Sequence, residues 1–216
     1  MSIILSVLVL APPLIFAITL HEAAHGRMAL ACGDTTAKVL GRITLNPIKH
    51  IDPIGTILVP IALFIISTQS GGFVPIFGWA KPVPVSIGNL RNPHRDQFWV
   101  AIAGPLANLL MAFGWYILYL FTKSMEIGLL QIFTQMAYYG VFINIVLMVL
   151  NMLPVLPLDG GRVLQSLLSK RLAYKFAITE RYGLFAIIFL LFPIINGRSI
   201  LSLILSPVIQ AVSNLL

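Results

Sequence analysis

Long apolar runs separated by short polar connections set the pattern of this 216-residue sequence. The runs over residues 3–31, 98–121 and 130–153 reach the length of about 20 residues that a helix needs to cross the hydrocarbon core of a membrane. Two shorter runs, at residues 182–195 and 200–215, close the chain, and we predict that they also form helical spans. The pattern is typical of an all-α polytopic membrane protein.

The connection between the first two long runs predicts a less regular structure. Its apolar part, residues 54–67, is too short for a complete span, so we expect it to re-enter the membrane or to return without a net crossing. This gives about five to six transmembrane helices in all. Residues 38–45 are short, rich in β-formers and followed by Asn46-Pro47, which predicts a strand or short β-hairpin at the membrane surface after the first helix. Residues 83–87, where Val and Ile alternate with Pro and Ser, predict a second extended element.

The composition supports this class. Hydrophobic residues make up 58% of the chain and charged residues only 10%, and the mean hydropathy is +0.95, far above that of a soluble domain. We therefore expect one membrane-embedded domain over residues 1–216, with a core at residues 1–170 and C-terminal helices at residues 180–216. The net charge of +7 would suit nucleic acid, but the basic residues form short groups without interleaved aromatic residues, so we expect a lipid partner and no nucleic acid.

The basic residues also predict the topology. With the N-terminus outside and no net crossing by residues 54–67, twelve of the fourteen Lys and Arg residues lie inside, and only Lys123 and Arg198 lie outside. A single crossing by that segment would move eight of the fourteen outside. The first arrangement predicts a multi-pass protein of the cell membrane in which the ends of the first and third long runs lie on the cytoplasmic side.

A possible metal site lies near the inner end of the first run. His21 and His25 are separated by one helical turn and so share one face of the helix, with Glu22 beside them as a candidate general base for metal-bound water. A catalytic zinc takes three protein ligands and keeps one position open. Cys32 is the single cysteine, which excludes a cysteine-based zinc cluster.

Asp159 is the acid that best completes this site. It directly follows the third long run, in a stretch broken by Pro and Gly, and an ionisable group at membrane depth is a functional candidate by default. The favoured topology puts it at the same depth as His21 and His25, so the three can bind one zinc ion. His50 and His94 lie in basic loops, and we expect both to be solvated surface residues.

Polar side chains inside the apolar runs have two interpretations. Asn108, Asn144 and Asn151 could form interhelical hydrogen bonds. Alternatively, Asn108 or Asn151 could donate a hydrogen bond to the scissile carbonyl or to the substrate backbone. Gly104 is expected to be a close-packing position.

Three segments, at residues 21–25, 104–108 and 151–161, together resemble the motifs of the site-2 protease family of intramembrane zinc metalloproteases. The resemblance implies that His21, His25 and Asp159 bind one zinc ion and that Glu22 activates water. It also implies that an extended loop presents the substrate, a transmembrane segment of another protein, as a β-strand. Residues 38–45 and 83–87 are the candidate edges. Without an inserted PDZ domain or a CBS tail, the chain is similar to the compact prokaryotic branch.

Two functions from other classes remain as alternatives. A metal-ion transporter would place further ionisable residues along its spans, whereas these spans offer one acid pair of interest, Glu22 and Asp159. In a non-catalytic membrane scaffold, the histidines would simply pack within a helix interface. The sequence favours the intramembrane endopeptidase, acting in regulated intramembrane proteolysis.

Overall fold

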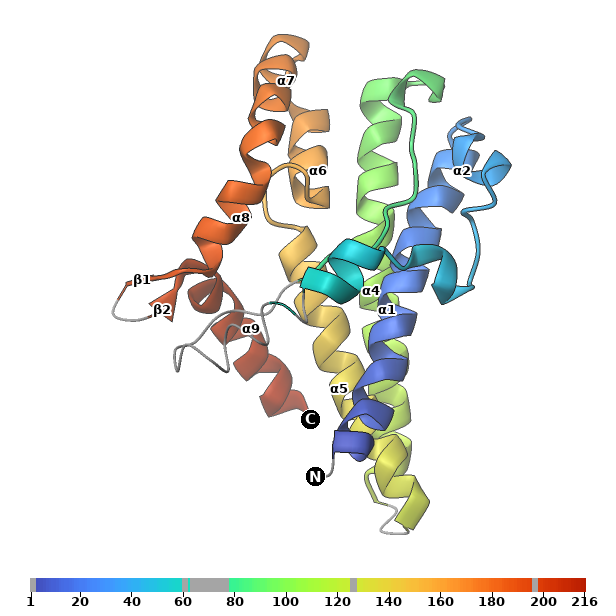
Figure 1. Ribbon diagram of the computed structural model, residues 1–216, viewed down its shortest axis with the longest axis vertical. Helices are drawn as coiled ribbons and strands as arrows, with labels where there is room; N and C mark the ends of the chain where they lie inside the picture. Colours follow the sequence, from blue (N-terminus) through green and yellow to red (C-terminus); the bar gives the residue numbers. More distant parts are fainter. Residues whose placement is uncertain (1–2, 60–61, 63–77, 125–127, 196–197) are drawn as a thin grey trace.

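Three long helices, α1 (Ile3–Ala31), α4 (Pro93–Thr122) and α5 (Gly128–Asn151), pack side by side at the centre of the fold (Figure 1). The structure is a computed structural model that describes residues 3–59, 62, 78–124, 128–195 and 198–216. These three helices are long and apolar enough to cross a membrane. A helix suits that environment because it satisfies its own backbone hydrogen bonds. The all-α membrane class is confirmed.

Shorter elements surround this bundle. The other helices are α2 (Thr36–Val39), α6 (Asp159–Leu167), α7 (Lys170–Ala177), α8 (Gly183–Leu191) and α9 (Ile200–Leu215), with short helical turns η1 (Pro47–His50), η2 (Pro53–Leu58), η3 (Ile87–Asn89) and η4 (Ile178–Tyr182). The strands β1 (Pro193–Ile195) and β2 (Arg198–Ser199) pair antiparallel between α8 and α9. Helices α6 and α7 continue upward from α5 in Figure 1.

The long connection between α1 and α4 returns to the end of the bundle from which it leaves. The backbone N–H of Arg91 donates to the carbonyl of Cys32 at 3.0 Å, so the two ends of this connection touch. Accordingly, α1 and α5 run in one direction and α4 in the other (Figure 1). The expected absence of a net crossing between these helices is therefore found. Half of residues 54–67 lie outside the described part, so the path of this segment is not assigned.

The β-hairpin expected after the first helix is not confirmed. Thr36–Val39 forms helix α2, and Gly41, at φ 61°, then turns the chain, with the N–H of Arg42 bonded to the carbonyl of Ala37. A left-handed glycine after a helix is a common stop signal, and it outweighs the β-branched composition here. Residues 81–86 belong to no helix and lie in the extended connection that leads to α4 in Figure 1, but within the described residues they pair with no strand.

The number of spans is also not confirmed. The C-terminal runs form α8, with nine residues, and α9, with sixteen, both shorter than the roughly 20 residues of a complete span. Within the described residues, three helices meet the length and hydropathy of a span, against the expected five to six. Helix α9 packs on α5, and the Tyr119 hydroxyl donates to the carbonyl of Leu216 at 2.5 Å.

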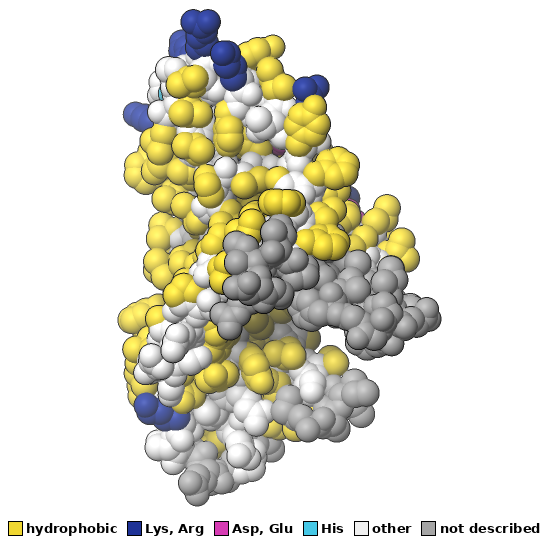
Figure 2. Space-filling view, turned by 90° about the vertical axis from the view of Figure 1, so that its left-hand side faces the viewer, with side chains coloured by type: hydrophobic (Ala, Val, Ile, Leu, Met, Phe, Trp, Pro, Cys, Tyr) yellow, Lys and Arg dark blue, Asp and Glu magenta, His cyan; other side chains and the backbone are white. Residues whose placement is uncertain are grey.

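The surface agrees with immersion in lipid. On the face shown in Figure 2, hydrophobic side chains cover much of the described surface, and the Lys and Arg side chains gather mainly at the upper end. That end carries α7, which begins Lys170-Arg171 (Figure 1). A broad exposed apolar surface of this kind is stable in a bilayer and would aggregate in water.

Candidate metal centre

The structure brings His21, His25 and Asp159 together. The Nε2 atoms of the two histidines lie 3.1 Å apart. The carboxylate of Asp159 reaches both, with Oδ2 at 3.2 Å from His21 Nε2 and Oδ1 at 3.3 Å from His25 Nε2. The two histidines lie on α1, and Asp159 is the first residue of α6. These three residues form the one group of potential ligands that could hold a metal ion among the described residues.

The other ring nitrogen of each histidine fixes its orientation. His25 Nδ1 lies 2.7 Å from the backbone carbonyl of Val100, which can only accept, so this nitrogen carries a proton. His21 Nδ1 donates in the same way to the side-chain oxygen of Asn108 at 2.5 Å. In the neutral imidazoles, both Nε2 lone pairs therefore point toward each other and toward the carboxylate.

Such an arrangement of three acceptors is repulsive unless a cation lies between them. Asp159 Oδ2 is buried and has no hydrogen-bond donor, which is costly for a carboxylate oxygen. Two imidazole nitrogens and one carboxylate oxygen are a ligand set that zinc prefers when it keeps an open position for chemistry. The residues present therefore fit a catalytic zinc ion.

Asn108 belongs to a buried polar network behind His21. Its amide nitrogen donates to the side-chain oxygen of Asn144 at 3.0 Å and to the carbonyl of Ala17 at 3.4 Å. Asn144 in turn donates to the carbonyl of Gly140 at 2.8 Å. Asn108 and Asn144 are fully buried. The network joins α1, α4 and α5, and it occupies both ends of the Asn108 amide, which favours a role in orienting His21 over direct contact with a substrate.

Gly104 is part of the wall of this site, which sequence reasoning did not recognise. A Cβ atom at this position would lie 2.3 Å from His25 Nε2 and 2.7 Å from His21 Cε1. Any side chain would therefore push into the metal ligands. Glycine lets α4 approach α1 at the depth of the ligands, so the expected close-packing role applies to the site itself.

Glycines also set the position of Asp159. A Cβ atom on Gly160 would lie 2.2 Å from the Met152 carbonyl oxygen, and one on Gly161 would lie 2.6 Å from the backbone nitrogen of Leu156. Without these side chains, the first turn of α6 can pack directly against the loop that follows α5. The Asp159 carboxylate is thereby directed back to α1.

Glu22 lies beside the ligands and is held by the extended segment 81–86. Its Oε2 accepts a hydrogen bond of 2.7 Å from the backbone N–H of Val83. The Val83 side chain packs next to Gly26 of α1: a Cβ on Gly26 would lie 3.1 Å from Val83 Cγ1.

Asn151, at the end of α5, donates to the Leu147 carbonyl within its own helix at 3.1 Å.

A buried carboxylate outside the membrane helices anchors the same segment. Asp34 accepts hydrogen bonds from the Thr36 hydroxyl at 2.5 Å, from the backbone N–H groups of Thr36 and Ser86 at 2.9 and 2.7 Å, and from the Asn89 side chain at 3.2 Å. Burial alone would raise the pKa of Asp34, but these hydrogen bonds outweigh it and hold the pKa below its ordinary value. The chain after α1 is thereby tied to the segment that contacts Glu22.

The two loop histidines differ from each other. His94 is exposed, as expected. His50 is only 2% exposed, and its Nε2 lies 3.0 Å from the carbonyl of Thr44, so the prediction of a solvated surface residue was wrong. The η1 turn, capped by Asn46, folds the ring back over the preceding loop. A basic neighbour such as Lys49 therefore does not imply that a histidine is exposed.

Comparison with known proteins agrees with this geometry. Residues 9–136 and 122–194 match peptidase family M50. The chain belongs to peptidase family M50. It is thus a site-2-type metalloprotease, as its motifs indicated, and the resemblance to the site-2 protease family is confirmed.

Two relatives match most of the length of this M50 peptidase, and a third matches part of it. YwhC of Bacillus subtilis, named as a candidate zinc metalloprotease, is 36% identical over 202 residues, which cover 92% of this chain and 84% of YwhC. Rip2 of Mycolicibacterium smegmatis, named in the same way, is 29% identical over 184 residues, 84% of this chain and 66% of Rip2. Stage IV sporulation protein FB of B. subtilis is 33% identical over 85 residues, 39% of this chain and 27% of that protein. No solved structure gives a significant match to the chain.

Proposed function

We propose that this M50 peptidase is a zinc-dependent intramembrane endopeptidase that cleaves transmembrane or membrane-proximal segments of other membrane proteins. The observation that carries the proposal is the convergence of His21, His25 and Asp159 between membrane helices, with Glu22 adjacent. Zinc is the cofactor, consistent with the names of the relatives YwhC and Rip2.

Each residue has a defined part in this mechanism. His21, His25 and Asp159 hold the zinc ion through the atoms that converge in the structure. When bound, zinc supplies Lewis acidity, lowering the pKa of a coordinated water and polarising the scissile carbonyl. Glu22 takes a proton from the attacking water and delivers it to the leaving amine nitrogen. Asn108 holds the His21 ring at the angle that directs Nε2 to the metal.

The substrate reaches the site as an extended chain. A helical peptide is closed to attack because its amides are hydrogen-bonded and sterically enclosed, so a transmembrane substrate must unwind locally. The extended segment 81–86, which passes beside Glu22, is the favoured edge for the unwound substrate. Pro82 and Pro84 have no N–H, and the N–H groups of Val83 and Ser86 are bound to Glu22 and Asp34, so the substrate would pair mainly with backbone carbonyls of this segment. Its Val83 is buried against α1, so the segment is fixed close to the site. Asn151 remains a candidate for contact with the substrate backbone.

The site faces the cytoplasm in this proposal. The ends of α1 and α5 and the start of α4 lie at the same end of the bundle, as Figure 1 shows. Most Lys and Arg residues lie in the connections at this end, as the positive-inside rule requires of a cytoplasmic face.

The decisive experiment is the variant Glu22→Gln in the intact protein. It is expressed in a membrane beside candidate single-pass membrane proteins, and the fragments that accumulate with the wild type are mapped. We expect Glu22→Gln to keep one zinc per chain and to lose cleavage by at least about 100-fold. Retained cleavage would overturn the proposal. Readily exchangeable metal without cleavage would indicate a transporter, and absence of metal in the wild type would indicate a scaffold.

A further inference from the structure

A cavity of about 800 Å³ lies between the start of α4 and the end of α6. Its lining combines basic, aromatic and aliphatic residues: His94, Arg95, Phe98, Trp99, Leu167 and Lys170. Asp159 is at the opposite end of α6, so the cavity is separate from the metal centre. Under the cavity, Gln97 donates to Gln165 at 2.9 Å and joins the two helices.

The charge of this basic cavity is positive. Arg95 and Lys170 are exposed at its edge, and His94 lies beside them. The one acid in the lining segments, residues 92–99 and 166–170, is Asp96. Asp96 is only 2% exposed and is paired with Arg95 at 3.2 Å, so these two charges compensate each other and Lys170 supplies the net positive charge. The Arg95 side chain is nevertheless 73% exposed, so its guanidinium can also bind a second anion. A ligand in this cavity would therefore carry negative charge.

Trp99, which lines the cavity, also begins a stripe of exposed apolar residues along α4. Trp99 is 50% exposed, and Leu106, Leu110 and Phe113 are 50%, 65% and 62% exposed. Their spacing of seven, four and three residues puts them on one face of the helix. Tryptophan at the top of such a stripe is typical of the level at which lipid headgroups lie. The ligand thus needs a negatively charged head and an apolar tail.

We propose that the basic cavity binds an anionic phospholipid, with the phosphate beside Arg95 and Lys170 and the acyl chains along the α4 stripe. Basic pockets between membrane helices are suited to such headgroups. The lipid would contact both α4 and α6, the helix that begins at Asp159. A bound lipid therefore bridges two elements that position the metal centre.

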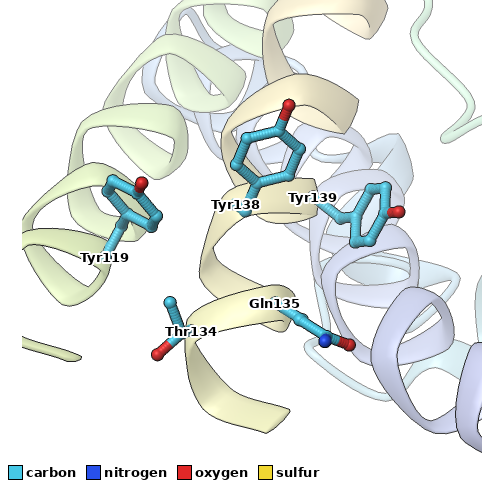
Figure 3. A pocket seen from close by; sticks show the side chains of 5 residues that line it. All are labelled: Tyr119, Thr134, Gln135, Tyr138 and Tyr139. Atoms are coloured by element: carbon cyan, nitrogen blue, oxygen red, sulfur yellow. The ribbon is translucent and has the colours of Figure 1, made fainter. Parts of the chain in front are cut away.

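A second cavity differs from the basic cavity because its lining, among the described residues, contains no Lys, Arg, Asp or Glu side chain. It has a volume of about 260 Å³ and is lined by Tyr119 of α4 and by Thr134, Gln135, Tyr138 and Tyr139 of α5, as Figure 3 shows. None of these side chains carries a charge at neutral pH. Lys123 lies nearby, with Nζ 5.6 Å from the centre of the Tyr119 ring. This lysine supplies a control of equal charge at the other end of α4.

The test measures lipid binding to the purified full-length protein in a neutral detergent. Phosphatidylglycerol and phosphatidylcholine with the same acyl chains are titrated, and bound lipid is counted by native mass spectrometry. We expect the wild type to prefer phosphatidylglycerol. The double variant Arg95→Gln/Lys170→Gln should weaken phosphatidylglycerol binding by about tenfold or more, and Lys123→Gln should leave it unchanged.

The proposal would be overturned by equal binding of the two lipids, by unchanged binding of the double variant, or by an equal loss with Lys123→Gln. Because Arg95 is paired with the buried Asp96, its loss could disturb the fold. The single variant Lys170→Gln therefore provides an independent reading, with an expected loss of several-fold. Glycerol 3-phosphate serves as a competitor without acyl chains. Displacement of the lipid at equal concentration would show a site for free phosphate and would also overturn it.

Discussion

The Nδ1 atom of His21 lies 2.5 Å from the side-chain oxygen of Asn108, although 87 residues separate the two in the chain. The amide nitrogen of Asn108 is held by Asn144 and by the backbone of α1, so its oxygen has a fixed direction. This pair determines which tautomer His21 adopts. It therefore decides whether His21 Nε2 presents a lone pair to zinc.

Replacing Asn108 by alanine should weaken zinc binding. Loss of the oxygen frees the His21 ring, and outer-shell changes of this kind cost about 10- to 100-fold in metal affinity. The measurement is zinc retention of the purified variant against a chelator of known affinity. If Asn108 instead contacts the substrate, the variant will keep wild-type zinc affinity and lose only turnover, which would contradict the orienting role.

Gly104→Ala should remove zinc and activity together. The added Cβ would lie 2.3 Å from His25 Nε2, on an α4 backbone that is packed against α1. Either the ring or the helix must move, so we expect zinc content to fall by more than half and cleavage by at least about tenfold. Zinc analysis and cleavage of a co-expressed substrate measure the two effects.

Gly114→Ala is the matched control for Gly104→Ala. It lies on the same helix, and a Cβ there would meet no atom within 4 Å. We expect unchanged zinc content and activity, with a slight gain in stability because alanine favours a helix more than glycine does. Equal losses in both variants would mean that α4 tolerates no change and that Gly104 has no special relation to the ligands.

The sequence predicted the parts of this fold that depend on composition and spacing. The apolar runs gave α1, α4 and α5, and the charge count placed Asp159 at the depth of His21 and His25. The residues that contact the two histidines from α4 could not be predicted in this way. Membrane helices are apolar on every side, so the pattern does not show which face of α4 meets α1, and the contact of Val100 or Gly104 with a histidine depends on that rotation.

The prediction of strands in the connection after α1 failed for a different reason. Its β-branched residues predicted strands, but Gly41 and Asp34 provide local turns and hydrogen bonds that satisfy the backbone without a neighbouring strand. The Val83 N–H, which a strand partner would have bound, is bound by the Glu22 carboxylate. Propensity describes single residues, and it could not anticipate a partner 61 positions away.

Asp34 should make the stability of the protein depend on pH in the acidic range. Its hydrogen bonds lower the pKa in the folded state, so the unfolded state binds the proton more tightly. The stabilisation is therefore present above the unfolded pKa of about 3.9 and is lost as the pH falls through the folded value. Thermal unfolding in detergent from pH 7 to pH 3 should show the wild type more stable than Asp34→Asn at pH 7, with the difference shrinking below about pH 4.

The stability difference between wild type and Asp34→Asn at low pH tests whether ionisation of Asp34 is its cause. Asparagine keeps the size of the side chain but not its charge, so the comparison isolates the ionised carboxylate that accepts from Ser86 and Thr36. A difference between wild type and Asp34→Asn that stays constant down to pH 3 would show that the contribution of Asp34 is packing and not ionisation.

Zinc should stabilise the folded protein because its ligands join α1 to α6. A ligand that binds only the folded state at 100 times its dissociation constant adds about 2.7 kcal/mol, which corresponds to about 5–11 °C in the unfolding midpoint of a chain of this size. We expect a chelator to lower the midpoint of the wild type and added zinc to restore it.

Asp159→Ala should lose this response to zinc, because it removes one of the three ligands. Glu22→Gln should retain the response while lacking activity, because Glu22 contacts Val83 and lies outside the ligand group. A midpoint of the wild type that is insensitive to the chelator, in a sample shown to have lost its zinc, would contradict the link between α1 and α6.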